Sequence, residues 1–290
     1  MNDNEKKDVA ITATNVSSVD DVGHVSDVNQ STLHFILLRP QNYLPAVLIL
    51  GVAFFFGYLT HDYFDFFFFG MAGIFVLYAY NLNIVRGLLM RQFAKDLGYK
   101  YTGQGNRESV VGSLFGIGHS RSISHVIDSI NESHPVRIFF YSYIVGEGKS
   151  SHTYQNTVFE KTFDCIVPHI LVHKPDLFFS NDIPVFEGGV NLTLEGDFNK
   201  YFSLTVQKDF EMEAYEIFTP DVMEELIETS KKFGFEFIQN KLYIYTRKFI
   251  DKRTELDDLF TLSEKLCSQF ESVLHGMEGD VKAVRDTLKK

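Results

Sequence analysis

The chain has 290 residues, of which 45% are hydrophobic, and this is enough apolar material for a core in one or two domains. Its formal net charge is −11, and no cluster of Lys and Arg could follow a phosphate backbone, so nucleic acid is excluded as an expected partner. The two cysteines, Cys165 and Cys267, form no Cys-x-x-Cys pair and exclude a disulfide framework, so both are expected to be buried, reduced thiols.

Residues 1–32 are rich in Asp, Asn, Ser and Val and show neither a helical nor a strand periodicity. They are predicted to form a flexible acidic tail. A secretory signal peptide would need a basic segment followed directly by a short apolar core, and residues 1–32 do not have this arrangement. We therefore expect the tail to be retained.

Two apolar runs follow, at residues 43–60 and 63–80, and they are unusually rich in Phe. At ~1.5 Å per residue, each run gives roughly 27 Å of helix, which is close to the ~30 Å thickness of the hydrocarbon layer. We therefore predict two transmembrane helices. Because residues 61–62 alone separate them, the helices should form a tight antiparallel hairpin.

The charges that flank the hairpin predict its orientation. Arg39 precedes it and Arg86, Arg91 and Lys95 follow it, whereas the connecting residues contain no Lys or Arg. The protein is then expected in the cell or inner membrane, and the positive-inside rule places both of its termini on the cytoplasmic side. The residues expected at the membrane interface are Arg39, Tyr43, Tyr63, Asp65, Tyr80 and Arg86; an ion or proton site at Asp65 is the alternative for that residue.

The second span is predicted to continue as a helical stalk. Apolar residues repeat every four positions from Val85 to Leu97, and Gly98 is a suitable residue to end the helix. The expected organisation is an acidic tail (1–32), a transmembrane hairpin with its stalk (33–97), a cytosolic domain (98–250), and a C-terminal amphipathic helix with a tail (251–290).

Residues 99–250 contain mostly strand patterns. β-Branched and aromatic runs at 135–145 and 152–167 flank a turn-forming segment and predict a hairpin. Further strands are expected at 168–175, which prolines bracket, at 192–207 and at 211–219. Residues 235–246 are interpreted as two strands joined at Gln239 and Asn240.

Two helices have clear start signals in the sequence. Thr219, as an N-cap before Pro220, opens a helix that Gly234 should close. Thr254 can cap a second helix, whose apolar stripe consists of Leu259, Leu262, Leu266, Phe270, Val273 and Met277. The predicted fold class is α+β, with a transmembrane hairpin, a mainly antiparallel sheet and two or three helices in the cytosolic part.

Residues 195–246 contain the ordered patterns EGDFNKYF, TPDVMEELIE and NKLYIY, and an upstream block contains GHSR at 118–121 and PVRIFFYSY at 135–143. These patterns resemble a prokaryotic family of membrane-anchored domains of unknown function, over roughly residues 43–250. The resemblance implies two spans before an α+β domain and supplies no catalytic residue. Gln239 and Asn240 stand where similar sequences have Gly in the last hairpin turn.

The glycine-rich stretch GSLFGIGHSRSISHVI, at residues 112–127, contains the candidate site. Gly116 and Gly118 could present backbone N–H groups to an anion, with Arg121 as a partner, although the stretch matches neither a Walker A loop nor a dinucleotide loop. His119, Arg121 and His125 are the weak catalytic candidates. The interpretation that we favour is a tight glycine turn with Arg121 at the surface.

The segment after this turn fits two structures. The apolar residues Ile123, Val126, Ile127 and Ile130 have helical spacing, whereas the turn-forming residues before Pro135 suit a strand that leads into a hairpin. Both alternatives remain open from the residues alone. The resemblance favours a strand.

Other polar groups predict no metal or cofactor site. His169 and His173 would stand some 13 Å apart on a strand. The acidic residues Asp221, Glu224, Glu225 and Glu228 follow a helix start, where they favour the helix dipole and solvent over catalysis.

The predicted function is therefore a membrane-anchored cytoplasmic interaction or regulatory module, with the bilayer and a protein or a second copy as partners. The alternative is a membrane-tethered enzyme that acts on a phosphorylated or lipid substrate near His119, Arg121 and His125.

Overall fold

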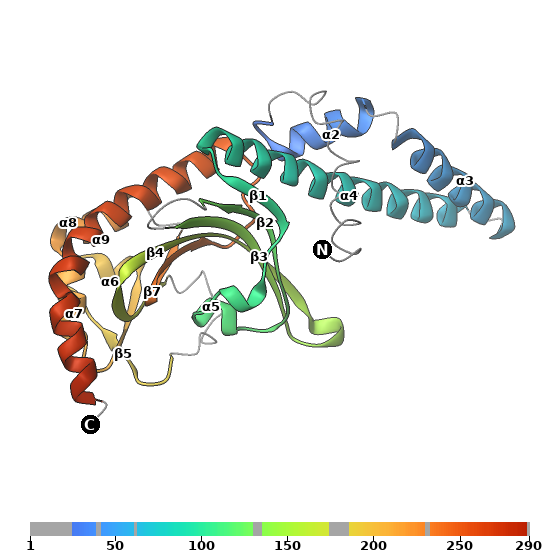
Figure 1. The fold of residues 1–290 in the computed structure, drawn as a ribbon. Helices are drawn as coiled ribbons and strands as arrows, with labels where there is room; N and C mark the ends of the chain where they lie inside the picture. The colour runs from blue at the N-terminus through green and yellow to red at the C-terminus, as the bar shows by residue number, and fades with distance from the viewer. Residues whose placement is uncertain are drawn as a thin grey trace, which may run out of the picture. The chain divides into compact units, whose positions relative to one another are not determined.

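The computed structural model describes residues 25–38, 42–60, 63–129, 135–173, 186–229 and 233–288 (Figure 1). The chain forms two compact units. The first contains residues up to Phe93 together with Asp251–Arg253, and the second contains Ala94–Ile250 and the residues from Thr254 onward.

Helices build the first unit. They are α2 (Val28–Leu38), α3 (Tyr43–Thr60) and α4 (Tyr63–Leu97), the last of which continues into the second unit. The predicted continuation of the second apolar helix to Leu97 is confirmed. The predicted tail extends too far, because Val25 and Val28 are buried and Asp27 Oδ1 accepts hydrogen bonds from two backbone N–H groups of α2. Residues 1–24 lie outside the described residues.

Small residues let α3 and α4 approach each other. Ala53 of α3 is fully buried, and a Cβ built on Gly70 of α4 would lie 3.9 Å from the Ala53 Cβ. A Cβ on Gly73 would collide with the Ile49 side chain. Close packing at small residues is the usual way in which membrane helices associate.

Replacing Gly73 with Leu is expected to separate the two helices, because the new side chain has no space beside Ile49. The distance between spin labels placed on α3 and α4 of the full-length protein should increase by several ångströms. Gly51→Leu is the control, since no atom lies within 4 Å of a Cβ built there. Equal distances in both variants would contradict this packing.

The second unit is built on a seven-stranded antiparallel sheet. The strands pair in the order β1-β2-β3-β4-β6-β5, and β7 also pairs with β4, which is therefore the central strand. Their bounds are β1 Lys100–Gln104, β2 His119–Asp128, β3 Val136–Val145, β4 His152–His173, β5 Gly189–Leu192, β6 Ser203–Gln207 and β7 Gly234–Thr246. The strand interpretation of residues 122–128 and the β3–β4 hairpin are confirmed.

In the part of the chain that the structure describes, seven helical segments accompany the sheet. They are η3 Arg107–Ser109, α5 Ser113–Gly116, η4 Gly148–Ser150, α6 Phe198–Tyr201, α7 Glu211–Ile217, α8 Pro220–Thr229 and α9 Arg253–Leu288. The α+β class with a mainly antiparallel sheet is confirmed, whereas the expected two or three helices were too few.

The two faces of the sheet are covered by different elements (Figure 1). On one face, the Phe237 and Phe270 rings lie 5.0 Å apart and join β7 to α9. On the other face, Phe115 of α5 contacts the rings of Tyr141 and Tyr243 at 5.0 and 4.9 Å. Cys165 and Cys267 are both buried, as expected, and burial raises the pKa of the Cys267 thiol.

Residues 168–173 are a strand, as predicted, but they continue β4 and do not form a separate strand at an edge. Residues 174–175 lie outside the described residues. Proline cannot donate a ladder hydrogen bond, yet it is tolerated at irregularities. The pairing with β7 shifts register between Val167 and Ile170, which is where Pro168 lies.

The predicted hairpin at Gln239 and Asn240 is also wrong, because residues 234–246 form one strand. Gln239 has a φ of 59° and lies at a shift of the β4–β7 register, so the left-handed residue makes a bulge instead of a turn. The bulge exchanges the two faces of β7. Phe237 faces α9 before it, whereas Tyr243 faces α5 after it.

Residues 192–219 contain more helix than expected. The predicted strand at 192–207 is interrupted by the helical turn α6, in which Phe198 is buried. The predicted strand at 211–219 is the helix α7, because Ala214 and Ile217, three positions apart, are buried while Met212 and Tyr215 are exposed.

The two predicted long helices are confirmed with small changes at their ends. Helix α8 begins at Pro220 as expected, but Gly234 opens β7 and does not close the helix. Helix α9 begins at Arg253, one residue before the predicted cap at Thr254.

Candidate functional site

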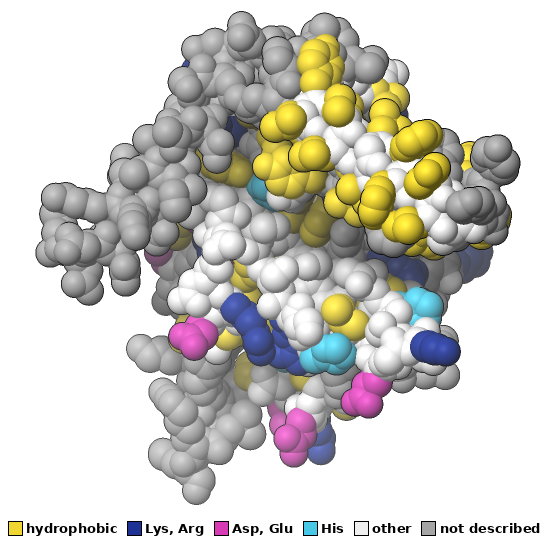
Figure 2. Space-filling model, turned by 90° about the vertical axis from the view of Figure 1, so that its right-hand side faces the viewer, with side chains coloured by type: hydrophobic (Ala, Val, Ile, Leu, Met, Phe, Trp, Pro, Cys, Tyr) yellow, Lys and Arg dark blue, Asp and Glu magenta, His cyan; other side chains and the backbone are white. Residues whose placement is uncertain are grey.

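Large exposed apolar side chains gather on α3 and α4 (Figure 2). In the described part of the chain, the exceptions are Leu33, Ile166, Met212 and Tyr215. The two apolar helical segments are Tyr43–Thr60 and Phe67–Leu97. Of the 18-residue apolar stretch in each segment, 6% and 11% respectively are buried. A core helix of a soluble domain would be mostly buried, so both helices have the length and the surface of membrane spans.

The structure treats the residues predicted at the membrane interface differently: some are exposed, one is paired, and some lie outside the described set. Tyr43 and Tyr80 are exposed, at 54% and 65%. Tyr63 and Asp65 lie in the first turn of α4, but their side chains are outside the described set, as is all of Arg39. Arg86 is engaged elsewhere in the first unit.

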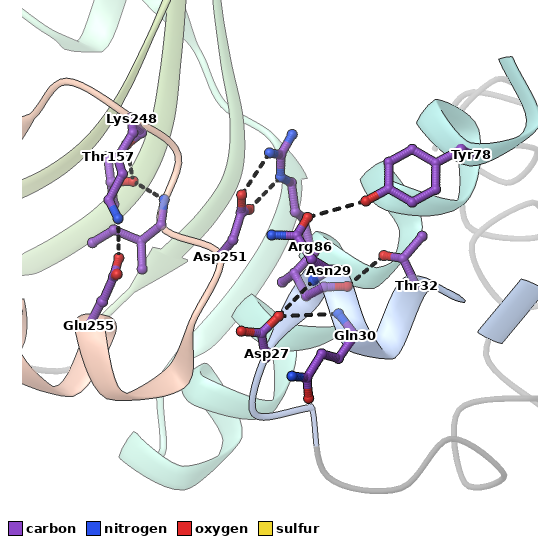
Figure 3. Close-up of polar contacts among 12 residues, drawn as sticks. Asp27, Asn29, Gln30, Thr32, Tyr78, Arg86, Thr157, Lys248, Asp251 and Glu255 are labelled. Carbon is purple, nitrogen blue, oxygen red and sulfur yellow. Dashed lines mark hydrogen bonds and ion pairs between the residues drawn. The ribbon is translucent and has the colours of Figure 1, made fainter. Parts of the chain in front are cut away.

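Arg86 forms a bidentate ion pair with Asp251 (Figure 3). Its Nε and Nη2 atoms donate to Asp251 Oδ1 and Oδ2 at 2.7 and 3.0 Å, and the two side chains are 16% and 23% exposed. Such paired, charge-assisted hydrogen bonds fix geometry as well as adding energy. The pair therefore ties α4 to the three-residue segment Asp251–Arg253, which follows β7.

The backbone at residues 26–28 is tied to the same segment. The Val28 N–H donates to the Asp251 carbonyl at 2.7 Å, and the Arg253 N–H donates to the Ser26 carbonyl at 2.9 Å. The Arg253 guanidinium lies over the Phe93 ring of α4, 4.8 Å from its centroid. We call Arg86 with Asp251–Arg253 and residues 25–28 the α4 clamp.

Arg86→Gln is expected to loosen the α4 clamp by about 1–2 kcal/mol, between the effects of exposed and buried ion pairs. Amide hydrogen exchange at Val28 and Arg253 should then become roughly 5–30 times faster in the full-length protein. Lys200→Gln is the control, because it removes one positive charge from a side chain that is 68% exposed and pairs with Asp197 outside the clamp. Equal exchange rates in the two variants would show that Arg86 does not hold the segment.

The glycine-rich stretch folds as α5, a turn at Gly118 with a φ of 63°, and the start of β2. Arg121 does not face outward from this turn. Its Nε donates to the carbonyls of Ile117 and Gly118, both at 3.0 Å, and its Nη2 donates to the Gly116 carbonyl. The guanidinium thus satisfies carbonyl groups at the end of α5, which favours the turn interpretation.

The other two candidates have separate partners. His119 is exposed, and its Nε2 lies 3.0 Å from the Gly146 carbonyl in the β3–β4 turn. His125 is buried, has a φ of 52°, and places its Nδ1 2.7 Å from the Tyr101 hydroxyl. Catalysis by His119, Arg121 and His125 remains a prediction.

A buried carboxylate that the sequence did not indicate lies beneath α5. Glu236 of β7 is fully buried, and its Oε1 accepts from the Ser113 N–H at 2.6 Å and lies 2.7 Å from His169 Nε2. A Cβ on Gly112, which has a φ of 137°, would lie 2.7 Å from Glu236 Oε2. The carboxylate therefore holds the first residues of α5 against the sheet.

A second buried carboxylate, Glu160 of β4, holds two cations. Its oxygens lie 3.2 Å from Arg137 Nη1 and 2.6 Å from Lys241 Nζ. Arg137 also pairs with Asp128 at 2.9 Å, and Lys241 donates to the Ser109 carbonyl of η3. These contacts join four strands, β2, β3, β4 and β7, to the segment that precedes α5.

The aromatic cluster next to α5 stays uncharged near neutral pH. Burial raises the pKa of Tyr141 to about 12, against the opposing charge of Arg121, and burial raises the pKa of Tyr143 to about 12 as well. Neither phenol is suited to act as a base at neutral pH.

Two of the residues that were considered for metal binding or acid chemistry are paired with other side chains. His169 pairs with Glu236, and its ring stacks on Phe186 at 3.6 Å. Glu225 of α8 pairs with Lys265 of α9 at 2.5 Å. Within the described residues, no group of three or more His, Cys, Asp or Glu side chains could hold a metal ion.

Comparison with known proteins adds one similar structure. No family model matches the sequence, and no curated protein matches it. The crystal structure of the mycobacterial trehalose monomycolate transport factor A, TtfA, is similar with a TM-score of 0.48 and 11% sequence identity, over 65% of this chain and 94% of that one.

Proposed function

We propose that this chain is an integral membrane protein in which α3 and α4 form a two-span anchor and the α+β unit is a cytoplasmic interaction or regulatory module. The observation that carries the proposal is the apolar surface of α3 and α4. Side chains such as Phe54, Phe67 and Phe75 are 65–70% exposed, and a surface of this size is stable in lipid rather than in water.

The charges near the hairpin support the proposed orientation. Arg86, Arg91 and Lys95 follow the apolar part of α4, so the side of the membrane that holds the second unit is the cytoplasmic one. The partner of the second unit is a protein or another copy of this chain.

The α4 clamp supports a regulatory role. Asp251–Arg253 belongs to the first unit, yet this segment lies four residues after the end of β7, and its last residue begins α9 of the second unit. A rotation or displacement of α4 that moves Arg86 would therefore act on both elements through the continuous chain.

Membrane fractionation and a topology reporter test the anchor. The full-length protein should stay in the membrane fraction after an alkaline carbonate wash and leave it in detergent. A reporter fused after Lys290 should be active in its cytoplasmic form. Release by carbonate would contradict the two-span anchor, and an external reporter signal would contradict the orientation.

A further inference from the structure

A cavity of about 520 Å³ opens in the second unit between α8, the end of β7 and the first turns of α9. Its apolar floor is formed by Phe233, Ile250 and Leu262, which are 9%, 2% and 8% exposed. Volumes of ~300–1,000 Å³ with an apolar floor and a few polar groups are typical of small-molecule sites. The cavity therefore has the size and the lining of a ligand site.

The wall next to Ile250 is fixed before any ligand arrives. Thr157 Oγ1 donates to the Lys248 carbonyl and accepts from the Ile250 N–H, both at 2.9 Å. Across the cavity, the ion pair between Lys265 and Glu225 joins α9 to α8. A preformed site loses little conformational entropy on binding, so these contacts favour affinity.

The charged residues of the lining determine which charge a ligand should carry. Both lysines of the lining are paired with glutamates, Lys265 with Glu225 and Lys248 with Glu255, each at 2.5 Å. The lining also contains Asp257 and Asp258, so carboxylates outnumber ammonium groups. The field inside the cavity is therefore negative and favours a cation.

We propose that this cavity binds a small organic cation, namely a protonated amine attached to an apolar body. The apolar body lies on Phe233, Ile250 and Leu262, and the ammonium group lies at the α9 wall near Asp258. This binding is independent of the membrane anchor, so either proposal can fail while the other stands.

Methyl NMR of the full-length protein in detergent micelles tests the site, with 2-phenylethylamine as the probe. The methyl signals of Ile250 and Leu262 should shift saturably with the amine. Phenylacetate, which has the opposite charge and a similar body, should bind at least tenfold more weakly. Asp258→Lys should weaken binding of the amine by about tenfold or more, because it reverses a charge at the wall.

Two further variants complete the test. Glu216→Lys makes the same charge change at an exposed position of α7 outside the lining and should leave binding unchanged. Thr261→Trp places a large ring in the lining at an exposed position and should abolish binding while the fold is kept. Absent shifts, equal binding of phenylacetate, equal effects of Asp258→Lys and Glu216→Lys, or full binding by Thr261→Trp would each overturn the proposal.

Discussion

Glu160→Gln is expected to lower the free energy of unfolding of the second unit by about 2–3 kcal/mol. The Glu160 side chain is 1% exposed, and its carboxylate balances Arg137 and Lys241, which are 18% and 20% exposed. The amide of glutamine fills the same volume but carries no charge, so two partly buried cations lose their common counterion. Because both cations reach some solvent, the loss should be smaller than for a fully buried pair.

Chemical unfolding of the full-length protein, followed by near-ultraviolet circular dichroism of its tyrosines, measures this effect. Asp197→Asn is the matched control, because Asp197 and Lys200 form an ion pair with side chains that are 63% and 68% exposed. That variant should unfold like the unmodified protein. If the two variants unfold alike, Glu160 does not balance its neighbours.

The elements that the sequence predicted correctly have local signals. The two long apolar helices are continuous apolar runs, the β3–β4 hairpin has a turn of glycines between apolar strands, and α8 begins at Pro220, directly after Thr219. Each of these signals lies within one continuous stretch of the chain. These elements can be predicted from neighbouring residues alone, because their signals do not depend on residues far away in the sequence.

The errors arise where a residue depends on distant partners. Gln239 has a positive φ that a hairpin turn also needs, and its pairing with Val167 of β4 makes it a bulge. The sequence was therefore interpreted as two strands where there is one. Glu236, which alternation alone would not place in the core, is buried because Ser113 and His169 reach it from 123 and 67 residues away.

In the candidate site, too, the local features were predictable and the contacts between distant residues were not. The glycines and Arg121 were recognisable as a unit, and the structure does bring them together, but the guanidinium meets carbonyl oxygens of the turn. Arg86 was predicted to lie at the membrane interface. Its partner Asp251 is 165 residues away, and no spacing rule connects two positions so distant.

Gly118→Ala is expected to destabilise the second unit by about 3 kcal/mol or more. Gly118 has a φ of 63°, and a Cβ there would lie 2.3 Å from the carbonyl oxygen of Ile144. That oxygen belongs to the backbone of β3 and cannot move without displacing the strand. The variant must change either the turn or the start of the β2–β3 pairing, where His119 lies opposite Ile144.

Gly116→Ala distinguishes the turn from an anion site. No atom lies within 4 Å of a Cβ built on Gly116, which ends α5, so this variant should be as stable as the unmodified protein or slightly more stable. Binding of inorganic phosphate to the folded Gly116→Ala protein, measured by calorimetry, should then equal that of the unmodified chain. If the substitution instead removes phosphate binding without loss of stability, the backbone at Gly116 contacts an anion, and Arg121 has a role beyond closing the turn. A stable Gly118→Ala variant would contradict the geometry of the turn itself.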